Sequence, residues 1–160
     1  MPVESPALPP SIQTKLDLGN TQFRPLGDVL TAMRDLDLTA AEVRALVELG
    51  YLAAFNIAVA TDSKAELRIL TRSIDHYRSL KKKRVFEMPW AQLFRLIVPH
   101  GKPVVTGLEI QRGLNCDRGH VENLVLAECL KALQESKPGP GGSWTISRDS
   151  FEAFMKGRLL

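Results

Sequence analysis

Residues 38–77 read LTAAEVRALVELGYLAAFNIAVATDSKAELRILTRSIDHY, and this stretch decides the fold class of the chain. Its first part carries a helix start signal, because Thr39 and Glu42 have the spacing of a capping box, in which a hydroxyl and a carboxylate satisfy two amides of the first turn. Gly50 is typical of a helix end that needs a left-handed residue. The stretch therefore begins with a predicted helix that runs from Thr39 to Gly50.

A hairpin and a closing helix are predicted after this first helix. Residues 51–59 and 67–70 are rich in the aromatic, β-branched and other apolar side chains of strands, and the polar segment 60–66 joins them. Ser73 has the chemistry to cap a short helix that continues into the basic run 81–84, KKKR. A solvated helix end is the simpler interpretation of that run, and a phosphate contact is the functional one.

The sequence before residue 38 predicts one more helix and an N-terminal arm. Leu26, Val29, Leu30 and Met33 recur at helical spacing, so residues 26–34 are expected to form an amphipathic helix, followed by a turn. Residues 1–22 are rich in proline and polar residues and are expected to form a flexible arm.

The second half of the chain carries similar signals. An amphipathic helix is expected at 89–97, where Pro99 ends it, and Thr106 and Glu109 form a second capping box. Asp117 can cap the next helix. The remaining elements expected there are a strand at 129–133, a glycine-rich loop at 137–143, a strand at 144–147 and a last helix opened by Ser150.

The two halves repeat one pattern of apolar residues. A shift of 78 places Val43, Leu46, Val47, Leu52 and Phe55 on Val121, Leu124, Val125, Leu130 and Leu133, and a shift of 77 places Ile69, Ser73, Ile74, Asp75 and Tyr77 on Ile146, Ser150, Phe151, Glu152 and Phe154. A rival shift of 67 superposes the two capping boxes. We prefer 78 and 77, because they preserve the distance from helix to hairpin. The predicted organisation is an arm at 1–22 and two modules at 23–84 and 85–160.

Composition limits the class of protein. The chain has 160 residues, 44% of them hydrophobic and 24% charged, as in a soluble globular protein. It has no apolar run or signal sequence that would place it in a membrane, and its two cysteines make no disulfide framework, so we expect a cytoplasmic protein. The net charge of +3 permits a polyanionic partner without requiring one.

The strings VRALVELGYLAAFNIA and LRILTRSIDHY resemble the excisionase or MerR-like winged helix-turn-helix family. The strings HVENLVLAECLKAL and SWTISRDSFEAF resemble a more divergent copy. The resemblance implies a mainly α fold with small β-hairpin wings, arranged as two tandem winged helix-turn-helix modules. It also implies binding to double-stranded DNA, in which the second helix of each module enters the major groove and the wing reaches the backbone.

The residue types exposed on these expected elements give the candidate DNA contacts. In the first module they are Arg44 on the helix, Lys64, Arg68 and Arg72 on or near the wing, and Lys81, Lys82, Lys83 and Arg84 after the closing helix. In the second module they are Gln111, Arg112, Arg118, His120, Asn123 and Arg148. Arginine pairs well with guanine and asparagine with adenine, so we expect the second helix of the second module to read bases. Gln111, Arg112 and Arg148 and the basic residues of the first module are expected to hold phosphates.

The sequence fits a metal site or an enzyme less well than DNA binding. Cys116, His120 and Cys129 lack a recognised four-ligand zinc spacing, and no phosphate-binding glycine loop or complete nucleophile, base and oxyanion set is evident. We therefore expect a non-catalytic protein without a cofactor or metal. It would serve as an excisionase-like recombination factor or a transcription regulator of a mobile element, with an integrase or other recombinase as partner and homo-oligomers on DNA. The alternative is a protein-interaction adaptor for assembly or segregation, favoured by the alanine-rich, acidic face around Arg44.

Overall fold

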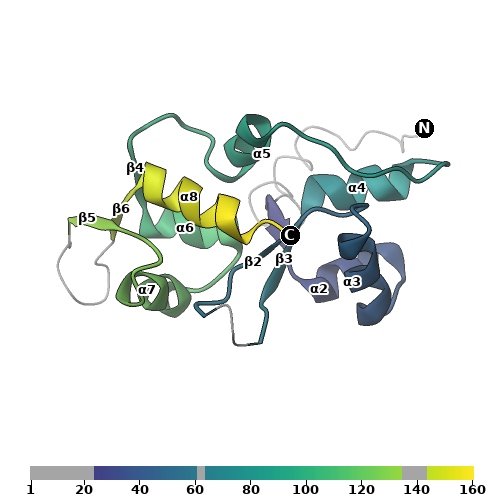
Figure 1. The fold of residues 1–160 in the computed structure, drawn as a ribbon, viewed down its shortest axis with the longest axis horizontal. Coiled ribbons are helices and arrows are strands. Elements are labelled where there is room, and N and C mark those ends of the chain that lie inside the picture. The colour runs from purple at the N-terminus through teal and green to yellow at the C-terminus, as the bar shows by residue number, and fades with distance from the viewer. Residues whose placement is uncertain (1–23, 61–63, 135–143) are drawn as a thin grey trace, which may run out of the picture.

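The structure of the protein, a computed structural model, describes residues 24–60, 64–134 and 144–160 (Figure 1). Within these residues the chain is mainly helical, with seven helices and two three-stranded antiparallel sheets. The predicted class of a mainly α protein with small hairpins is confirmed. The predicted arm at 1–22 and the predicted glycine-rich loop at 137–143 lie outside the described residues.

One order of elements occurs twice. The first unit consists of β1 (Leu26–Gly27), α2 (Val29–Leu36), α3 (Ala40–Glu48), β2 (Ala54–Asn56), β3 (Leu67–Leu70) and α4 (Thr71–Ser79). The second unit consists of β4 (Val104–Thr106), α6 (Gly107–Leu114), α7 (Arg118–Leu126), β5 (Ala132–Gln134), β6 (Thr145–Ser147) and α8 (Arg148–Arg158). A separate helix, α5 (Trp90–Ile97), lies between the units in sequence.

The backbone follows the predicted shifts of 78 and 77. Asp37 and Asn115, which are 78 residues apart, end the first helix of each pair in the same left-handed conformation, with φ of 55° and 54°. Gly50 and Glu128, also 78 apart, follow the second helix with φ of 86° and 63°. In the sheets Ala54 pairs with Ile69, and Ala132 pairs with Ile146. The internal repeat is therefore present in the backbone as well as in the apolar pattern.

Both predicted capping boxes form, but at different places in the repeat. Thr39 and Glu42 start α3, the second helix of the first pair, whereas Thr106 and Glu109 start α6, the first helix of the second pair. The position equivalent to Thr39 is Asp117, which caps α7. The rival shift of 67, which superposed the two boxes, is thus wrong.

Several predicted boundaries are corrected. Leu26 lies in strand β1, and the helix begins at Val29 after the cap Asp28. The sequence did not predict this strand, because two residues give no periodicity to detect. The strands expected at 51–59 and 129–133 shorten to β2 and β5. The closing helix α4 ends at Ser79, so the basic run 81–84 lies in the segment after it.

The two predicted serine caps also need correction. Neither Ser73 nor Ser150 starts its helix: α4 begins at Thr71 and α8 begins at Arg148. Each hydroxyl instead accepts a hydrogen bond from a hairpin amide, from Ala53 to Ser73 and from Lys131 to Ser150, both at 3.1 Å. The serines therefore fasten the closing helix of each unit to its own hairpin.

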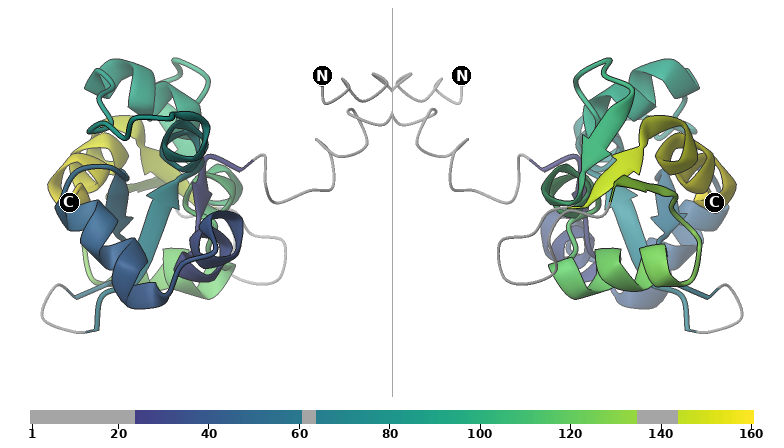
Figure 2. Two further views of the ribbon diagram at one scale, coloured as in Figure 1. Left: turned by 90° about the vertical axis from the view of Figure 1, so that its right-hand side faces the viewer. Right: turned by 90° about the vertical axis from the view of Figure 1, so that its left-hand side faces the viewer.

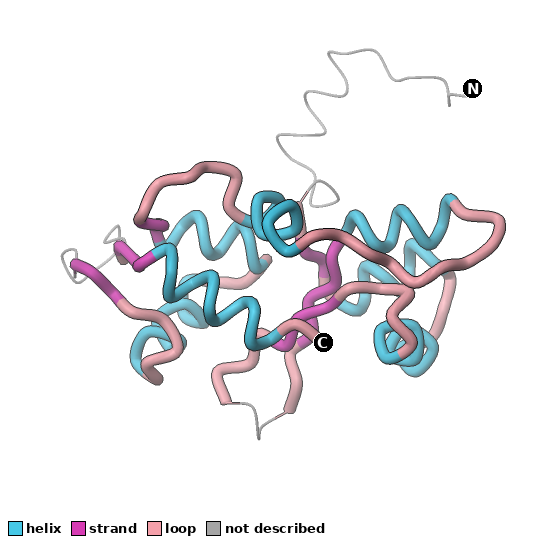
Figure 3. The backbone as a smooth tube through the Cα atoms, turned by 45° about the horizontal axis from the view of Figure 1, so that its top comes forward, coloured by secondary structure: helices cyan, strands magenta, loops and turns pink. Residues whose placement is uncertain are grey.

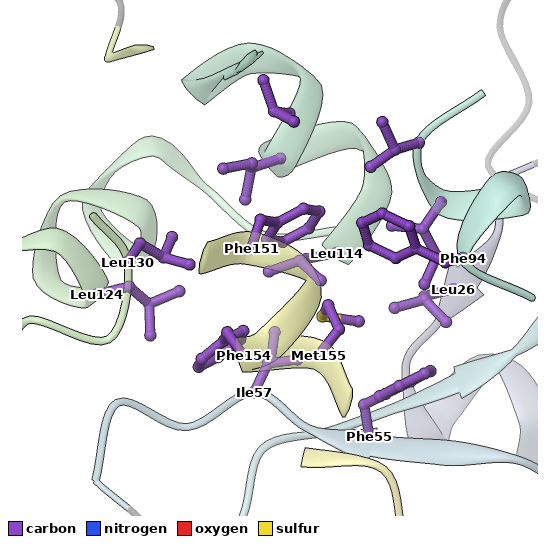
Figure 4. Packing of buried hydrophobic residues seen from close by; sticks show 14 of the residues in the cluster. Leu26, Phe55, Ile57, Phe94, Leu114, Leu124, Leu130, Phe151, Phe154 and Met155 are labelled. Atoms are coloured by element: carbon purple, nitrogen blue, oxygen red, sulfur yellow. The ribbon is translucent and has the colours of Figure 1, made fainter. Parts of the chain in front are cut away.

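Two hydrophobic clusters fill the interior. The smaller cluster lies within the first unit, among α2, α3 and its sheet, and includes Val43, Leu52 and Ile69. The larger one joins both units, because Phe55 of β2 and Ile57 just after it pack with residues of α8 such as Met155 (Figure 4). The predicted division at residue 84 therefore falls between units that share a core.

The end of the chain returns to the first sheet. Leu159 forms an isolated antiparallel bridge with Phe55, and the amide of Leu160 donates to the carbonyl of Ala54 at 2.9 Å. Figure 3 shows the C-terminus beside these strands. The last residues thus extend the sheet of the first unit at the outer edge of β2.

Helices α3 and α7 lie toward the same edge of the molecule, on either side of the β2–β3 hairpin (Figure 1). Both side views of Figure 2 agree with this placement, and they put α4 and the segment that follows it toward the opposite edge. Among the described residues, none of the helices has the length and apolar character needed to cross a bilayer.

Candidate nucleic-acid interface

The second helix of each unit is positioned by a short turn. The left-handed Asp37 ends α2 and Thr39 caps α3, while the left-handed Asn115 ends α6 and Asp117 caps α7. A single residue, Leu38 or Cys116, separates each left-handed residue from the cap that follows it. This geometry holds α3 and α7 at equivalent positions in their units, where each presents one face to solvent.

The solvent face of α3 carries one cation. Arg44 is exposed and has no ion pair among the described residues. Glu48 is exposed on the same helix, and Glu42 is held at its N-terminus. The backbone amide of Thr39 donates to Glu42 and lowers the pKa of that carboxyl, so a negative charge stays where a phosphate would otherwise bind a helix N-terminus.

The face of α7 keeps less of the predicted chemistry. Asn123 is exposed, as expected for a base-reading residue. Arg118 is half-buried and its Nε lies 2.9 Å from Glu122 one turn along the helix, so part of its charge is already compensated. Leu126, at 75% exposure, is the most exposed of the large apolar side chains among the described residues.

His120 points away from the solvent face of α7 and into the contact between the units. Its Nε2 lies 2.6 Å from the carbonyl oxygen of Ile57, and its Nδ1 lies 3.8 Å from a carboxylate oxygen of Glu66. Only 13% of the side chain is exposed. The structure therefore corrects the outward orientation that the sequence analysis assigned to His120, because the hairpin of the first unit covers this end of α7.

Arg68 also lies between the units. Its Nε donates to the carbonyls of Leu114 and Asn115 at 3.1 and 3.0 Å, where α6 ends, and Nη2 lies 3.3 Å from Glu66. The negative end of a helix dipole favours such a cation. With 14% of its side chain exposed, Arg68 holds protein carbonyls and is not positioned as a phosphate contact.

Arg148 packs beside α5 rather than projecting outward. Its guanidinium lies 5.0 Å from the ring centre of Phe94 and 3.8 Å from Glu152, and its Nε is buried without a partner among the described residues. The remaining predicted contacts differ in exposure: Lys64, Arg72 and Arg112 are exposed, whereas Gln111 is partly buried.

The basic run is not brought to the edge that holds α3 and α7. Lys81, Lys82, Lys83 and Arg84 are exposed and lie in the segment after α4, and Phe86 of this segment donates to Gly50 beyond the C-terminal end of α3 (Figure 1). Lys83 donates to the carbonyl of Tyr77 and lies 4.3 Å from its ring centre, so it caps the end of α4. The simpler interpretation of this residue, a helix-end cation, fits its contacts.

Sequence reasoning missed one residue that holds the units together. Arg158, near the end of α8, donates to the carbonyl oxygens of Asn56, Ala58 and Val59 in the first hairpin. The thiol of Cys129 in the second unit also reaches the carbonyl of Val59, at 3.5 Å. No local pattern signals these contacts, because each joins residues at least 70 positions apart.

The possible acid–base and thiol groups are occupied by structural contacts. His100 and Glu109 approach to 2.6 Å, but the amide of Lys102 donates to Nδ1 of His100, so both ring nitrogens are engaged. Burial raises the pKa of the Cys116 thiol to about 12, which leaves it protonated and a poor nucleophile. Among the described residues, no group of three or more His, Cys, Asp or Glu side chains could hold a metal ion.

The arrangement can therefore present two helix faces and one hairpin along a single edge, with Arg44 and Asn123 exposed on the helices and Lys64 on the hairpin. Searches of protein-family models, of curated proteins and of solved structures find no match to this chain.

Proposed function

We propose that the protein is a non-catalytic binder of double-stranded DNA, built from two tandem winged helix-turn-helix units. The observation that carries the proposal is the twofold occurrence of one helix pair and hairpin, with α3 and α7 along the same edge (Figure 1). Two such units in one chain would act as a dimer does and read neighbouring half-sites about one helical turn, roughly 10 base pairs, apart.

The side chains that remain available suggest how the edge would bind. Arg44 on α3 suits a guanine or a phosphate, Asn123 on α7 suits an adenine, and Lys64 at the hairpin suits the backbone. They are exposed, whereas Arg68 and His120 are held in the contact between the units. The proposed interface therefore rests on these three residues rather than on the longer set that the sequence suggested.

The charge of the two helices sets the expected strength of binding. Glu42, Glu48 and Glu122 flank Arg44 and Arg118, so the edge lacks a large positive excess. Few phosphates would then be neutralised, and the dependence of affinity on salt would be shallow but clear, since each neutralised phosphate contributes about −0.9 to the slope of log affinity against log salt.

Fluorescence anisotropy on a labelled duplex across a salt series tests this proposal. Arg44→Ala should weaken binding about tenfold, the loss expected for one good arginine contact. Arg95→Ala is the matched control, because Arg95 is also exposed but lies on α5 at the other edge. Equal losses for the two variants, or a salt slope of zero for the wild type, would count against a DNA-reading α3.

For the biological role we propose an excisionase-like recombination factor or a transcription regulator of a mobile element, acting in the nucleoid with an integrase or another protein as partner. The support is the resemblance of the strings around Arg44 and Ile146, together with the paired units. An excisionase-like protein would bend DNA, so circular-permutation gel shifts test that role. Binding without a bend would favour the regulator.

A second candidate is a winged-helix adaptor that binds protein through the same helices. Leu126 favours it, because a leucine that is 75% exposed sits on α7 where a polar base-reading residue is expected. The adaptor predicts that Leu126→Asp abolishes a protein complex seen by light scattering, with Arg44→Ala leaving that complex intact. The DNA proposal predicts that Arg44→Ala weakens DNA binding in the anisotropy assay and that Leu126→Asp leaves it unchanged.

A further inference from the structure

We propose that an apolar and basic surface at the end of α3 binds an acidic amphipathic segment of a partner protein. This surface, the α3-end surface, consists of Leu49, Val85, Lys81, Lys82 and Arg84. It lies at the junction between the C-terminal end of α3 and the segment that follows α4, and it contains none of Arg44, Asn123 and Lys64, the three residues of the proposed DNA interface. The proposal is independent of DNA binding.

Gly50 brings the two parts of the surface together. The amide of Phe86 donates to the carbonyl of Gly50 at 2.9 Å, which lays the segment after α4 against the end of α3. A Cβ at Gly50 would lie 3.3 Å from a methyl carbon of Val85, and the φ of Gly50 is +86°. The close approach and the left-handed backbone both favour glycine here.

Aromatic contacts hold the backbone of the surface in place. The ring of Phe86 packs edge-to-face on His76 of α4, with 5.3 Å between ring centres. Lys83 is folded back over Tyr77, and Tyr77 in turn packs on Tyr51 beyond Gly50. The contacts of Lys83 and Phe86 hold the segment that carries the exposed Lys81, Lys82 and Arg84.

The centre of the surface is apolar. Leu49 is 63% exposed and Val85 is 52% exposed, and Val85 lies against Gly50, the residue that follows Leu49. Large apolar side chains that lie together in solvent mark contacts with other molecules more often than single exposed ones do. A partner that covers them must offer apolar groups of its own.

The rim of the surface is positive. Lys81, Lys82 and Arg84 are exposed and form no ion pair with the described residues. The exposed carboxylates nearest to them in sequence are Glu87 and Asp75, and Asp75 pairs with Arg78. A phosphate backbone would satisfy the cations but would leave Leu49 and Val85 uncovered. An acidic segment with one apolar face satisfies both, and electrostatic complementarity of this kind gives specificity to protein contacts.

The probe for the test is a fluorescein-labelled helical peptide with leucine along one face and glutamate elsewhere. A peptide of the same composition with the leucines scattered serves as the comparison, because it keeps the charge and loses the apolar face. The full chain should bind the amphipathic peptide at least about tenfold more tightly than the scattered one. Raising the salt concentration should weaken both complexes.

Variants with matched exposure locate the binding site. Leu49→Ser should weaken the amphipathic complex about tenfold, whereas Leu30→Ser, at 64% exposure on α2, should leave it unchanged. Replacing Lys81, Lys82 and Arg84 by serine should remove most of the salt dependence. Circular dichroism of each variant checks that the fold is kept, as expected for substitutions of exposed side chains.

Three results would overturn the proposal. The wild type could fail to bind the amphipathic peptide, or bind both peptides equally. Leu30→Ser could weaken the complex as much as Leu49→Ser. The triple serine variant could lose affinity for duplex DNA and keep its affinity for the peptide, which would assign the basic run to nucleic acid. None of these results depends on whether Arg44 contacts DNA.

Discussion

The Nε of Arg68 in the first unit donates a hydrogen bond of 3.0 Å to the carbonyl of Asn115, the left-handed residue in the turn of the second unit. The hairpin that the sequence assigned to a wing is therefore joined to the helix pair of the other unit. Together with the contacts of Arg158 and His120, this bond fixes how α3 and α7 are spaced.

Arg68→Met should lower the free energy of unfolding by roughly 2 kcal/mol, because hydrogen bonds from a charged group are lost and the partly buried carbonyls of Leu114 and Asn115 lose this donor. Arg72→Met is the control at an exposed position, where changes stay within about 0.5 kcal/mol. Urea unfolding followed by circular dichroism measures both. Equal effects would show that the contact between the units contributes little to stability.

Ser73→Ala should destabilise the chain more than Ser150→Ala. Both hydroxyls accept from a hairpin amide, but Ser73 is fully buried and Ser150 is partly exposed, so water can replace only the second hydrogen bond. We expect about 1–2 kcal/mol for Ser73 and less for Ser150. Thermal unfolding compares the two, and a larger loss at Ser150 would contradict this account of the paired serines.

Replacing each of two glycines by alanine should change the stability of the protein in opposite directions. A Cβ at Gly113 in α6 would lie 2.9 Å from a side-chain carbon and 3.1 Å from the carbonyl of Ile97, so Gly113→Ala should push α5 away and destabilise the protein. Gly157 in α8 has no heavy atom of the described residues, outside its chain neighbours and the nearby backbone of its own helix, within 4 Å of such a Cβ. Gly157→Ala should stabilise by about 0.5–1 kcal/mol through helix propensity. Stabilisation by both variants would mean that α5 and α6 are not closely packed.

Acid should destabilise the protein through its capped carboxylates. Burial acts to raise the pKa of Glu109, but hydrogen bonds from Thr106 and His100 outweigh it and hold this pKa below its usual 4.5. A lowered pKa in the folded state gives stability that is present above the unfolded value and is lost as the pH falls through the folded value. Unfolding free energies should therefore decrease below about pH 4.5.

Glu109→Gln should show a shallower decrease over the same pH range, because the substitution removes the titrating group. Glu87→Gln, at an exposed position after the basic run, provides the comparison. A wild-type curve and a Glu109→Gln curve that run parallel would show that the capping box has no part in the acid response.

Local signals made much of the fold predictable. The capping boxes, the left-handed Gly50 and the apolar stripes of α3 and α7 depend on neighbours within a few residues, and they appear where the sequence placed them. The shifts of 78 and 77 were readable because a buried position stays apolar in both copies, as at Val43 and Val121.

Contacts between the units were not predictable. His120 and Arg68 look like exposed polar residues on their own elements, and only the packing of the first hairpin against the second unit turns them inward. Strands β1 and β4 were also missed, because two or three residues give no periodicity and their pairing partners are about 40 residues away. Candidate sites predicted from one sequence thus err where distant segments meet.

Hydroxyl-radical footprinting on a duplex selected from a random pool tests the central claim most directly. If the two units bind DNA together through α3 and α7, the protein should protect two segments on one face of the duplex, about one helical turn apart. Arg44→Ala should weaken one protected segment and Asn123→Ala the other. A single protected segment that both variants leave unchanged, or no protection at concentrations that saturate a known DNA-binding control, would contradict it.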